Sequence, residues 1–245
     1  MRLCSSAKNR NTLTFTNDLA AISNASGISR AELTMLDERR LHCLQHNLAS
    51  NKVTNHRFCR SQWYPFPRDL SFPPEKRLFR KWADGRMNLV EIGVFEAASS
   101  LIFRSVMAPT GTLHLIDPYV VVPDSGLTAR PWMAHLNVLR SRNGQVVWHR
   151  DYSGNVAKGW QAPIDFLFID GDHAYHACNH DWELWHAFVV PGGVVLFHDA
   201  RLGLGPGDSW DGWPGPSFVV DELFRGTSRL PQWNIVDEAG SLIVV

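Results

Sequence analysis

Acid and imidazole side chains follow two short apolar runs in the second half of the chain, residues 166–169 and 194–197. These side chains are Asp170, Asp172, His173, His198 and Asp199. Carboxylates and imidazoles brought together can bind a divalent cation, and a nearby base can then take the proton of an oxygen nucleophile. The residue types therefore indicate a site that activates a hydroxyl group, if the two runs end at the same place.

A strand–helix–strand unit would bring the two ends together. A helix with one apolar face is predicted between the runs, because apolar side chains recur there at spacings of three and four: Tyr175, Cys178, Trp182, Trp185 and Val189. Both runs are short and β-capable, so they are predicted to be buried strands. In an open parallel sheet the ligand crevice lies outside the carboxyl ends of the strands, and the polar side chains are expected to converge there.

Strands and helices alternate over the rest of the main domain as well. Further strands are expected at 88–93, 113–117, 146–149, 233–236 and 241–245, and further helices at 75–83, 97–107, 132–142 and 218–224. A tight turn joins the last two strands. The pattern predicts an α/β fold, with a Rossmann-like, mostly parallel sheet, helices on both faces and a C-terminal antiparallel hairpin.

Composition narrows the class of protein. The chain has 24 basic and 24 acidic residues, so its net charge gives no reason to expect nucleic acid or an anionic membrane as a partner. Its four cysteines are scattered without a C-x-x-C pair, which argues against a zinc ribbon or a disulfide scaffold and favours a cytoplasmic location. No run reaches the roughly 18 apolar residues of a membrane helix.

Two regions are expected along the chain, an N-terminal extension over residues 1–60 and a main domain over residues 61–245. The extension has a polar, disordered start and one helix, residues 29–47, which opens with a capping box and carries leucines on one face. That face must pack on the main domain or on a second subunit, so the sequence is compatible with a homodimer.

Glu91 and Gly93 lie at the first strand-to-helix turn, where glycine lets a ligand approach the backbone closely. The spacing differs from the G-x-G-x-x-G of dinucleotide-binding proteins, because position 91 is acidic and Ala97 stands at the third glycine position. An acid there would repel a pyrophosphate but suits an ammonium group. Asp117 ends the second strand, where a carboxylate can accept hydrogen bonds from ribose hydroxyls. Ordinary solvation of strand ends would also explain both acids.

Four segments resemble class I S-adenosylmethionine-dependent methyltransferases in their order and spacing. They are VEIGVFEAASS, LHLIDPY, DYSGNVAKGW and the stretch from IDFLFIDGDH to LFHDA. The branch that they resemble is the small-molecule O-methyltransferases whose fourth strand ends in I-D-G-D-H. The resemblance covers roughly residues 86–245. It implies methyl transfer from S-adenosylmethionine to a hydroxyl of a small-molecule acceptor, with metal assistance.

The resemblance implies a set of cofactor-binding residues. They are Glu91, Gly93, Asp117, Tyr119, Asp151, Ser153 and Asp170. Of these, Glu91 and Gly93 would hold the methionine part of the cofactor, and Asp117 the ribose. Tyr119 would flank the adenine, and the two loop residues 151 and 153 would line its pocket. The family usually has glycine where this chain has Ala97, whose methyl group is expected to crowd the cofactor.

The resemblance also implies a divalent cation held by Asp170, His198 and Asp199. Two carboxylates favour a hard ion such as magnesium, whereas His198 as the third ligand would shift the preference toward manganese, iron or zinc. If His198 instead faces the cofactor or a backbone carbonyl, magnesium is favoured.

The base that takes the acceptor's proton would be Asp172 or His173, which follow the metal-binding acid by two and three residues. His173 has the more suitable unperturbed acidity. The alternative is that both residues cap the helix that starts near Ala174.

A loop over residues 202–217 follows the second run, and a loop of this length in a compact domain is usually functional. Its Trp210 and Trp213 could close over an acceptor or pack against a partner subunit. A degenerate methyltransferase-like domain with a binding or assembly role is the alternative function, which Ala97 keeps open. A nicotinamide-dependent oxidoreductase is disfavoured by the missing phosphate-binding glycines.

Overall fold

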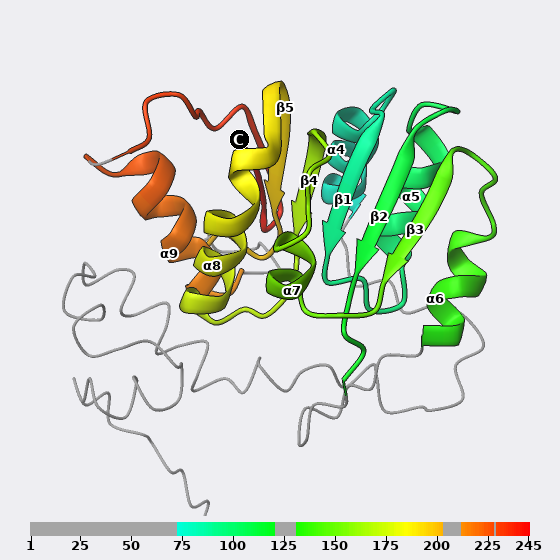
Figure 1. Ribbon diagram of the computed structural model, residues 1–245. Helices are drawn as coiled ribbons and strands as arrows, with labels where there is room; N and C mark the ends of the chain where they lie inside the picture. Colours follow the sequence, from blue (N-terminus) through cyan, green and yellow to red (C-terminus); the bar gives the residue numbers. More distant parts are fainter. Residues whose placement is uncertain (1–72, 121–130, 203–211, 228) are drawn as a thin grey trace, which may run out of the picture. The chain divides into compact units, whose positions relative to one another are not determined.

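The computed structural model describes residues 73–120, 131–202, 212–227 and 229–245 (Figure 1). All of them belong to one unit of the chain, Thr54–Val245. The helix predicted at 29–47, the boundary predicted after residue 60 and Trp210 lie outside the described residues.

The described residues form one mixed sheet with the strand order β3-β2-β1-β4-β5-β7-β6. Its strands are β1 (Asn88–Ile92), β2 (Thr112–Ile116), β3 (Gln145–His149), β4 (Ile164–Ile169), β5 (Val189–Phe197), β6 (Asp237–Ala239) and β7 (Leu242–Val244). Strands β1 to β5 run parallel, and β7 is antiparallel to both β5 and β6. The Rossmann-like sheet with a C-terminal antiparallel hairpin is therefore confirmed.

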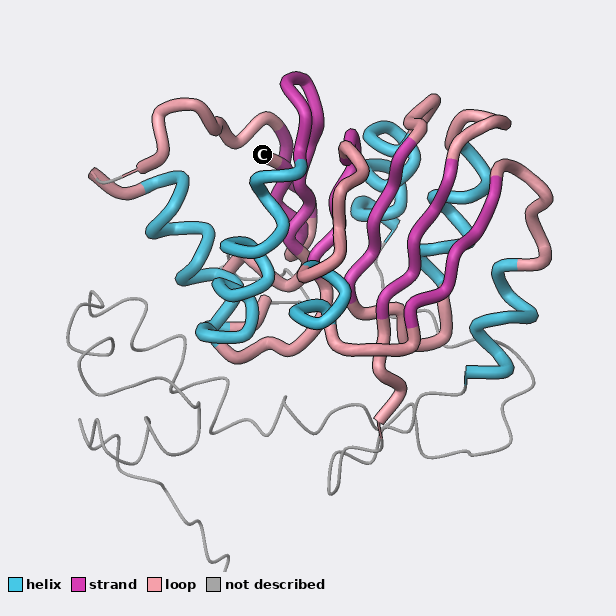
Figure 2. Tube along the Cα trace, in the orientation of Figure 1, coloured by secondary structure: helices cyan, strands magenta, loops and turns pink. Residues whose placement is uncertain are grey.

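Helices cover both faces of this sheet (Figures 1 and 2). They are α4 (Pro73–Ala83), α5 (Ala98–Val106), α6 (Pro131–Val138), α7 (Ser153–Ala157), α8 (Tyr175–Trp185) and α9 (Pro214–Val220). Helices α4, α5 and α6 pack on one face, and α7, α8 and α9 on the other. Among the described helices none has the length and apolar character needed to span a bilayer.

Alternating side chains along the strands build a separate core on each face. In β4, Phe166 and Phe168 join the core under α4 and α5, whereas Leu167 and Ile169 join the core under α8 and α9. Phe79 of α4 meets Phe168 edge to face, with ring centroids 5.3 Å apart. Because both faces are packed, the strand is held firmly and the position of the residues after it is fixed.

The closing hairpin begins later than predicted. Strand β6 spans Asp237–Ala239 instead of 233–236. Trp233 packs its indole against Trp182 of α8, with ring centroids 5.0 Å apart, and so serves the core. Helix α6 ends at Val138, before the predicted end at residue 142, and the short helix α7 was not predicted.

Candidate active site

The turn after β1 depends on Gly93. Its φ is +85°, and a Cβ at this position would lie 2.0 Å from the carbonyl oxygen of Asp170. Side chains are excluded there, so the turn after β1 lies directly against the end of β4. Ala97 also has a positive φ of 60°, a conformation that costs a residue with a Cβ about 1–2 kcal/mol. The alanine at the family's glycine position therefore adopts the backbone conformation that glycine favours.

Glu91 is fully buried behind this turn. Its Oε1 accepts a hydrogen bond from the hydroxyl of Ser99, but its buried Oε2 has no hydrogen-bond partner among the described residues. Burial is the main reason that the pKa of Glu91 rises to about 8. A buried acid with an unused oxygen is costly unless a ligand supplies a donor or a positive charge.

Asp117 ties the end of β2 to the same turn. Its Oδ2 accepts hydrogen bonds from the backbone N–H groups of Val94 (3.0 Å) and Phe95 (2.9 Å). Its Oδ1 accepts one from the N–H of Tyr119 (2.7 Å). The buried hydroxyl of Tyr119 has no hydrogen-bond partner within the described part of the chain, and burial raises the pKa of this phenol above its usual range. The carboxylate therefore orders the turn around Glu91.

Asp151 and Ser153 anchor the loop after β3. Asp151 is exposed, and its Oδ1 accepts hydrogen bonds from Asn155 Nδ2 (2.9 Å) and the N–H of Tyr152 (2.7 Å), which lower the pKa of its carboxyl. Ser153 donates its hydroxyl to the carboxylate of Asp181 on α8. Burial raises the pKa of Asp181 to about 6. The structure thus fixes the start of α7 against α8.

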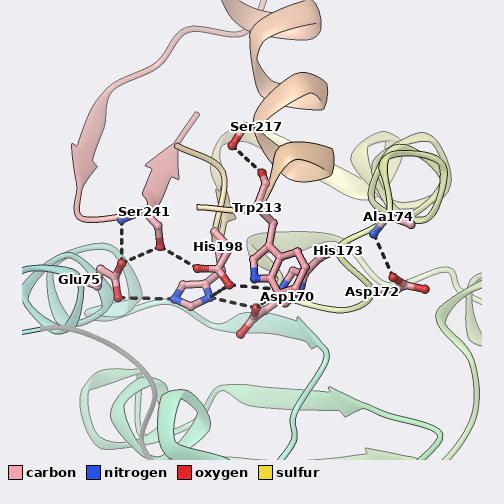
Figure 3. A network of polar contacts seen from close by, with 10 residues as sticks. Glu75, Asp170, Asp172, His173, Ala174, His198, Trp213, Ser217 and Ser241 are labelled. Atoms are coloured by element: carbon pink, nitrogen blue, oxygen red, sulfur yellow. Dashed lines mark hydrogen bonds and ion pairs between the residues drawn. The ribbon is translucent and has the colours of Figure 1, made fainter. Parts of the chain in front are cut away.

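A cluster of possible cation ligands lies at the ends of β4 and β5. Asp170, His173 and Asp199 each offer one ligand atom, and these atoms lie within 4.8 Å of one another. His173 Nε2 is 3.3 Å from Asp199 Oδ2 and 3.6 Å from Asp170 Oδ1 (Figure 3). Around a metal with bonds of about 2.1 Å, adjacent ligand atoms are about 3.0–3.4 Å apart. The Nε2 of His173 thus faces both carboxylates at close to the spacing of neighbouring ligand atoms around a cation.

His198 adjoins this cluster on the side of α4, and its Nδ1 lies 3.7 Å from Asp199 Oδ2. Its Nδ1 lies 3.0 Å from Asp170 Oδ1, and its Nε2 lies 3.5 Å from Oε2 of Glu75 on α4. Phe197 faces the core under α8 and α9, so by strand alternation the next side chain faces α4. Burial alone would lower the pKa of His198, but the carboxylates of Asp170 and Asp199 raise it well above its usual value. The predicted ligand role of His198 stays a prediction.

Asp172 lies apart from the cation cluster. Its Oδ1 accepts a hydrogen bond from the N–H of Ala174 (2.9 Å), the residue just before α8, and the side chain is exposed (Figure 3). Trp213, at the start of α9, stacks its indole on the ring of His173, with centroids 5.0 Å apart and planes at 11°. Of the two predicted bases, the structure places only His173 among the acids of strands β4 and β5.

Two residues of the site were not predicted. Glu75 is fully buried on α4, and Ser241 is fully buried just before β7. An acid in the first turn of a helix is common for electrostatic reasons alone, and a serine after glycine reads as an ordinary turn residue. Their proximity to His198 and Asp199 arises only in the folded chain.

Residues 90–200 match the family model described as "Methyltransferase domain". This range runs from β1 to just past β5 and contains Glu91, Asp117 and the cation cluster. The match and the sheet topology show a methyltransferase domain at residues 90–200, which is a domain of enzymes. Within that class, the matched model is that of methyltransferase family 24.

Solved structures of methyltransferases have a similar fold. A putative O-methyltransferase from Klebsiella pneumoniae is 12% identical, with a TM-score of 0.50 over 91% of this chain and 97% of that chain. The O-methyltransferase TomG from Streptomyces achromogenes, involved in tomaymycin synthesis and solved with its cofactor, is 18% identical, with a TM-score of 0.48 over 82% and 85%. An O-methyltransferase from Bacillus cereus, solved with S-adenosylhomocysteine, is 18% identical, with a TM-score of 0.42 over 74% and 76%.

A curated relative from Acanthamoeba polyphaga mimivirus is an uncharacterized protein. It is 47% identical over 36 residues, and the match spans 15% of this chain and 16% of that protein.

Proposed function

We propose that this protein transfers the methyl group of S-adenosylmethionine to a hydroxyl of a small molecule, with a divalent cation in the site. The observation that carries the proposal is the meeting of two features at Asp170. The turn beside Glu91 lies against the backbone of Asp170, while the carboxylate of Asp170 belongs to the cation cluster. A methyl donor held at the turn and an oxygen held at the cluster would therefore be neighbours.

The turn after β1 suits the methionine end of the cofactor. The unpartnered Oε2 of Glu91 offers an acceptor to an ammonium group, and the charge of that group would favour the carboxylate form. Asp117 would contact the ribose, as expected for an acid at the end of β2. Tyr119, Asp151 and Ser153 remain our candidates for the adenine pocket.

Asp170, His173 and Asp199 would hold the cation. When bound, such an ion stabilises the alkoxide form of the acceptor oxygen and fixes its position. Two carboxylates favour magnesium, and one imidazole also suits manganese, so both ions fit this donor set. With His173 occupied as a ligand, Asp172 would be left to take the acceptor's proton, and its exposed side chain would first have to turn from Ala174 toward the cluster. The methyl carbon then bonds to the acceptor oxygen while the sulfonium sulfur keeps the electron pair of the broken bond.

The acceptor would lie beside Trp213, which covers His173 from one side. Alignment of the acceptor oxygen with the methyl carbon is the main task of the protein, because displacement at a sulfonium methyl requires little else. A cation that stabilises an alkoxide supports a hydroxyl as the accepting group, and we propose a small molecule as the class of acceptor.

Calorimetric titration with S-adenosylhomocysteine, followed by a methylation screen over hydroxyl compounds with magnesium or manganese, tests this proposal. We expect micromolar binding and cation-dependent methylation of at least one class of acceptor. Folded protein that binds neither the cofactor product nor the ions would instead support a degenerate domain with a binding or assembly role.

A further inference from the structure

Glu75 stands behind the cation cluster and is connected to it by two routes. Its Oε1 accepts hydrogen bonds from the N–H and the hydroxyl of Ser241, both at 2.9 Å. Its Oε2 faces His198 Nε2 at 3.5 Å. Both residues that it meets also touch an acid of the cation cluster (Figure 3). Glu75 and Ser241 lie outside the segment that matches the methyltransferase family.

Each acid of the cluster gives one oxygen to this second layer. Asp199 Oδ1 lies 2.9 Å from the hydroxyl of Ser241, while its Oδ2 lies 3.3 Å from His173 Nε2. Asp170 Oδ1 lies 3.0 Å from His198 Nδ1. The second layer therefore fixes the rotation of both carboxylates about their Cβ–Cγ bonds.

The second layer is closely packed. Gly240 has a φ of +59°. A Cβ at this position would lie 2.6 Å from Glu75 Oε1, so the turn between β6 and β7 packs directly against the glutamate. The carbonyl oxygen of Ser241 accepts a hydrogen bond from the N–H of Ala200 at 2.8 Å. Asp199 itself has a positive φ of 52°, which neighbouring contacts must maintain.

We infer that Glu75, His198 and Ser241 are positioning residues that orient Asp170 and Asp199 toward the cation, and that His198 is a bridge within this layer instead of a metal ligand. The two ring nitrogens of His198 face carboxylates at 3.0 and 3.5 Å. A bond from Nδ1 to an ion would have to replace its hydrogen bond to Asp170, and Nε2 faces Glu75 instead of the cluster. This inference rests on the proposed function, because it assigns supports to the cation site that the function requires.

The size of the effect follows from the behaviour of other metal sites. Residues that orient metal ligands typically change metal affinity by about 10–100-fold when they are replaced. Glu75→Gln removes the charge but keeps the shape. Ser241→Ala removes the hydroxyl contact to Asp199 and keeps the backbone hydrogen bond to Glu75.

Titration of the full chain with Mn²⁺ tests the support. We expect Glu75→Gln and Ser241→Ala each to weaken Mn²⁺ binding by about 10–100-fold, with unchanged affinity for S-adenosylhomocysteine. Glu238→Gln is the matched control, because Glu238 lies on the same hairpin but pairs with Arg225 at the surface. Unchanged Mn²⁺ affinity in folded Glu75→Gln protein would overturn the inference.

Pulsed electron paramagnetic resonance of the bound Mn²⁺ decides which histidine is the ligand. A nitrogen bonded to Mn²⁺ gives a coupling that a nearby imidazole without a bond does not give. We expect this coupling in the wild-type protein and in His198→Gln, and its loss in His173→Gln. Loss in His198→Gln alone would make His198 the ligand and overturn the inference.

The two readouts separate this inference from the proposed function. Wild-type protein that binds S-adenosylhomocysteine but no Mn²⁺ would overturn both the metal assistance and the supporting layer. Wild-type protein that binds both, with Mn²⁺ affinity unaffected by Glu75→Gln, would overturn the supporting layer alone.

Discussion

Glu91 and Glu75 are both fully buried glutamates near the ends of the central strands, yet their surroundings differ. Glu75 faces Ser241 with one oxygen and His198 with the other. Glu91 has one oxygen without a hydrogen-bond partner in the ranges that the structure describes, and its pKa is raised to about 8 by burial. The comparison indicates that the fold supplies a polar partner for each oxygen of Glu75, which supports the site. It leaves one oxygen of Glu91 for the ligand that this acid is proposed to receive.

Replacing Asp170, which borders both the turn after β1 and the cation cluster, should have the largest effect. In Asp170→Asn we expect kcat/KM for methylation to fall by at least about 100-fold, because several kcal/mol of charge stabilisation at the oxygen are lost. Mn²⁺ binding should weaken in parallel, as measured by titration. Full activity in folded Asp170→Asn protein would show that the cation cluster has no role in catalysis.

The two residues predicted as bases should behave differently from each other. Asp172→Asn should lower kcat by about 100-fold, the usual contribution of a general base, without changing Mn²⁺ affinity. The amide oxygen of asparagine can still accept the hydrogen bond from the N–H of Ala174, so the fold should be retained. His173→Gln should weaken Mn²⁺ binding first of all. The reverse pattern, in stopped assays and titrations of both variants, would exchange the two roles.

Glu91→Gln should weaken binding of S-adenosylhomocysteine and leave Mn²⁺ binding unchanged. Loss of a hydrogen bond to a charged group is worth about 1.5–3 kcal/mol, which corresponds to a roughly 10–100-fold higher Kd for S-adenosylhomocysteine. Calorimetry at pH 8 measures this change, with Mn²⁺ affinity as the internal control. Unchanged cofactor affinity would remove Glu91 from the binding site.

Replacement of glutamate by glutamine should have opposite effects on the stability of the protein at positions 91 and 75. The pKa of Glu91 is about 8 in the folded protein and near the ordinary 4.5 of a glutamate when unfolded. The folded state therefore binds more protons between these values, and wild-type stability falls as pH rises through that range. Glu91→Gln should therefore lose less stability than the wild type from pH 5 to pH 9. Glu75→Gln should lower the free energy of unfolding by about 1–3 kcal/mol, because His198 loses a buried partner. Urea unfolding at several pH values measures the free energy of unfolding of both variants. A change of the same sign at pH 9 in Glu91→Gln and Glu75→Gln, relative to the wild type, would contradict the comparison.

Removing the indole that covers His173 should have the smallest effect. An aromatic stacking contact is worth about 0.5–1.5 kcal/mol, so Trp213→Ala should lower kcat/KM by about 2–10-fold. Trp213→Phe should keep most of the activity. A rise in KM with constant kcat would assign Trp213 to the acceptor, whereas a fall in kcat would assign it to His173.

Much of the fold could be predicted because its signals are local. The run from Phe166 to Ile169 is apolar throughout and ends in a polar cluster, which marks a buried strand and its end without reference to the rest of the chain. The general rule for open parallel sheets then predicts that Asp170, His173 and Asp199 meet, and the structure brings them within 4.8 Å of one another. The shift of β6 escaped prediction because Trp233, a residue of high β propensity, is used for packing on α8.

The supporting layer could not be predicted because its contacts are not local. Glu75 and Ser241 are separated by 166 residues and share no motif. The direction of His198 depends on the pleat of β5, which sequence alone fixes only if the faces of the sheet are already assigned. Sequence therefore predicted which residues gather at the strand ends, while the division between ligands and supports required the fold.

The hydrogen bonds between Glu75 and Ser241 have a consequence for how the protein folds. Strands β1 to β5 can pair before the closing hairpin arrives, but the cation site lacks part of its frame until β7 docks beside β5. Ion binding would then stabilise the state in which β7 has paired with β5, which is the last step of folding in this order. Added Mn²⁺ should slow the unfolding of the hairpin and, since a ligand of the native state stabilises the whole cooperative unit, raise the melting temperature of the entire domain.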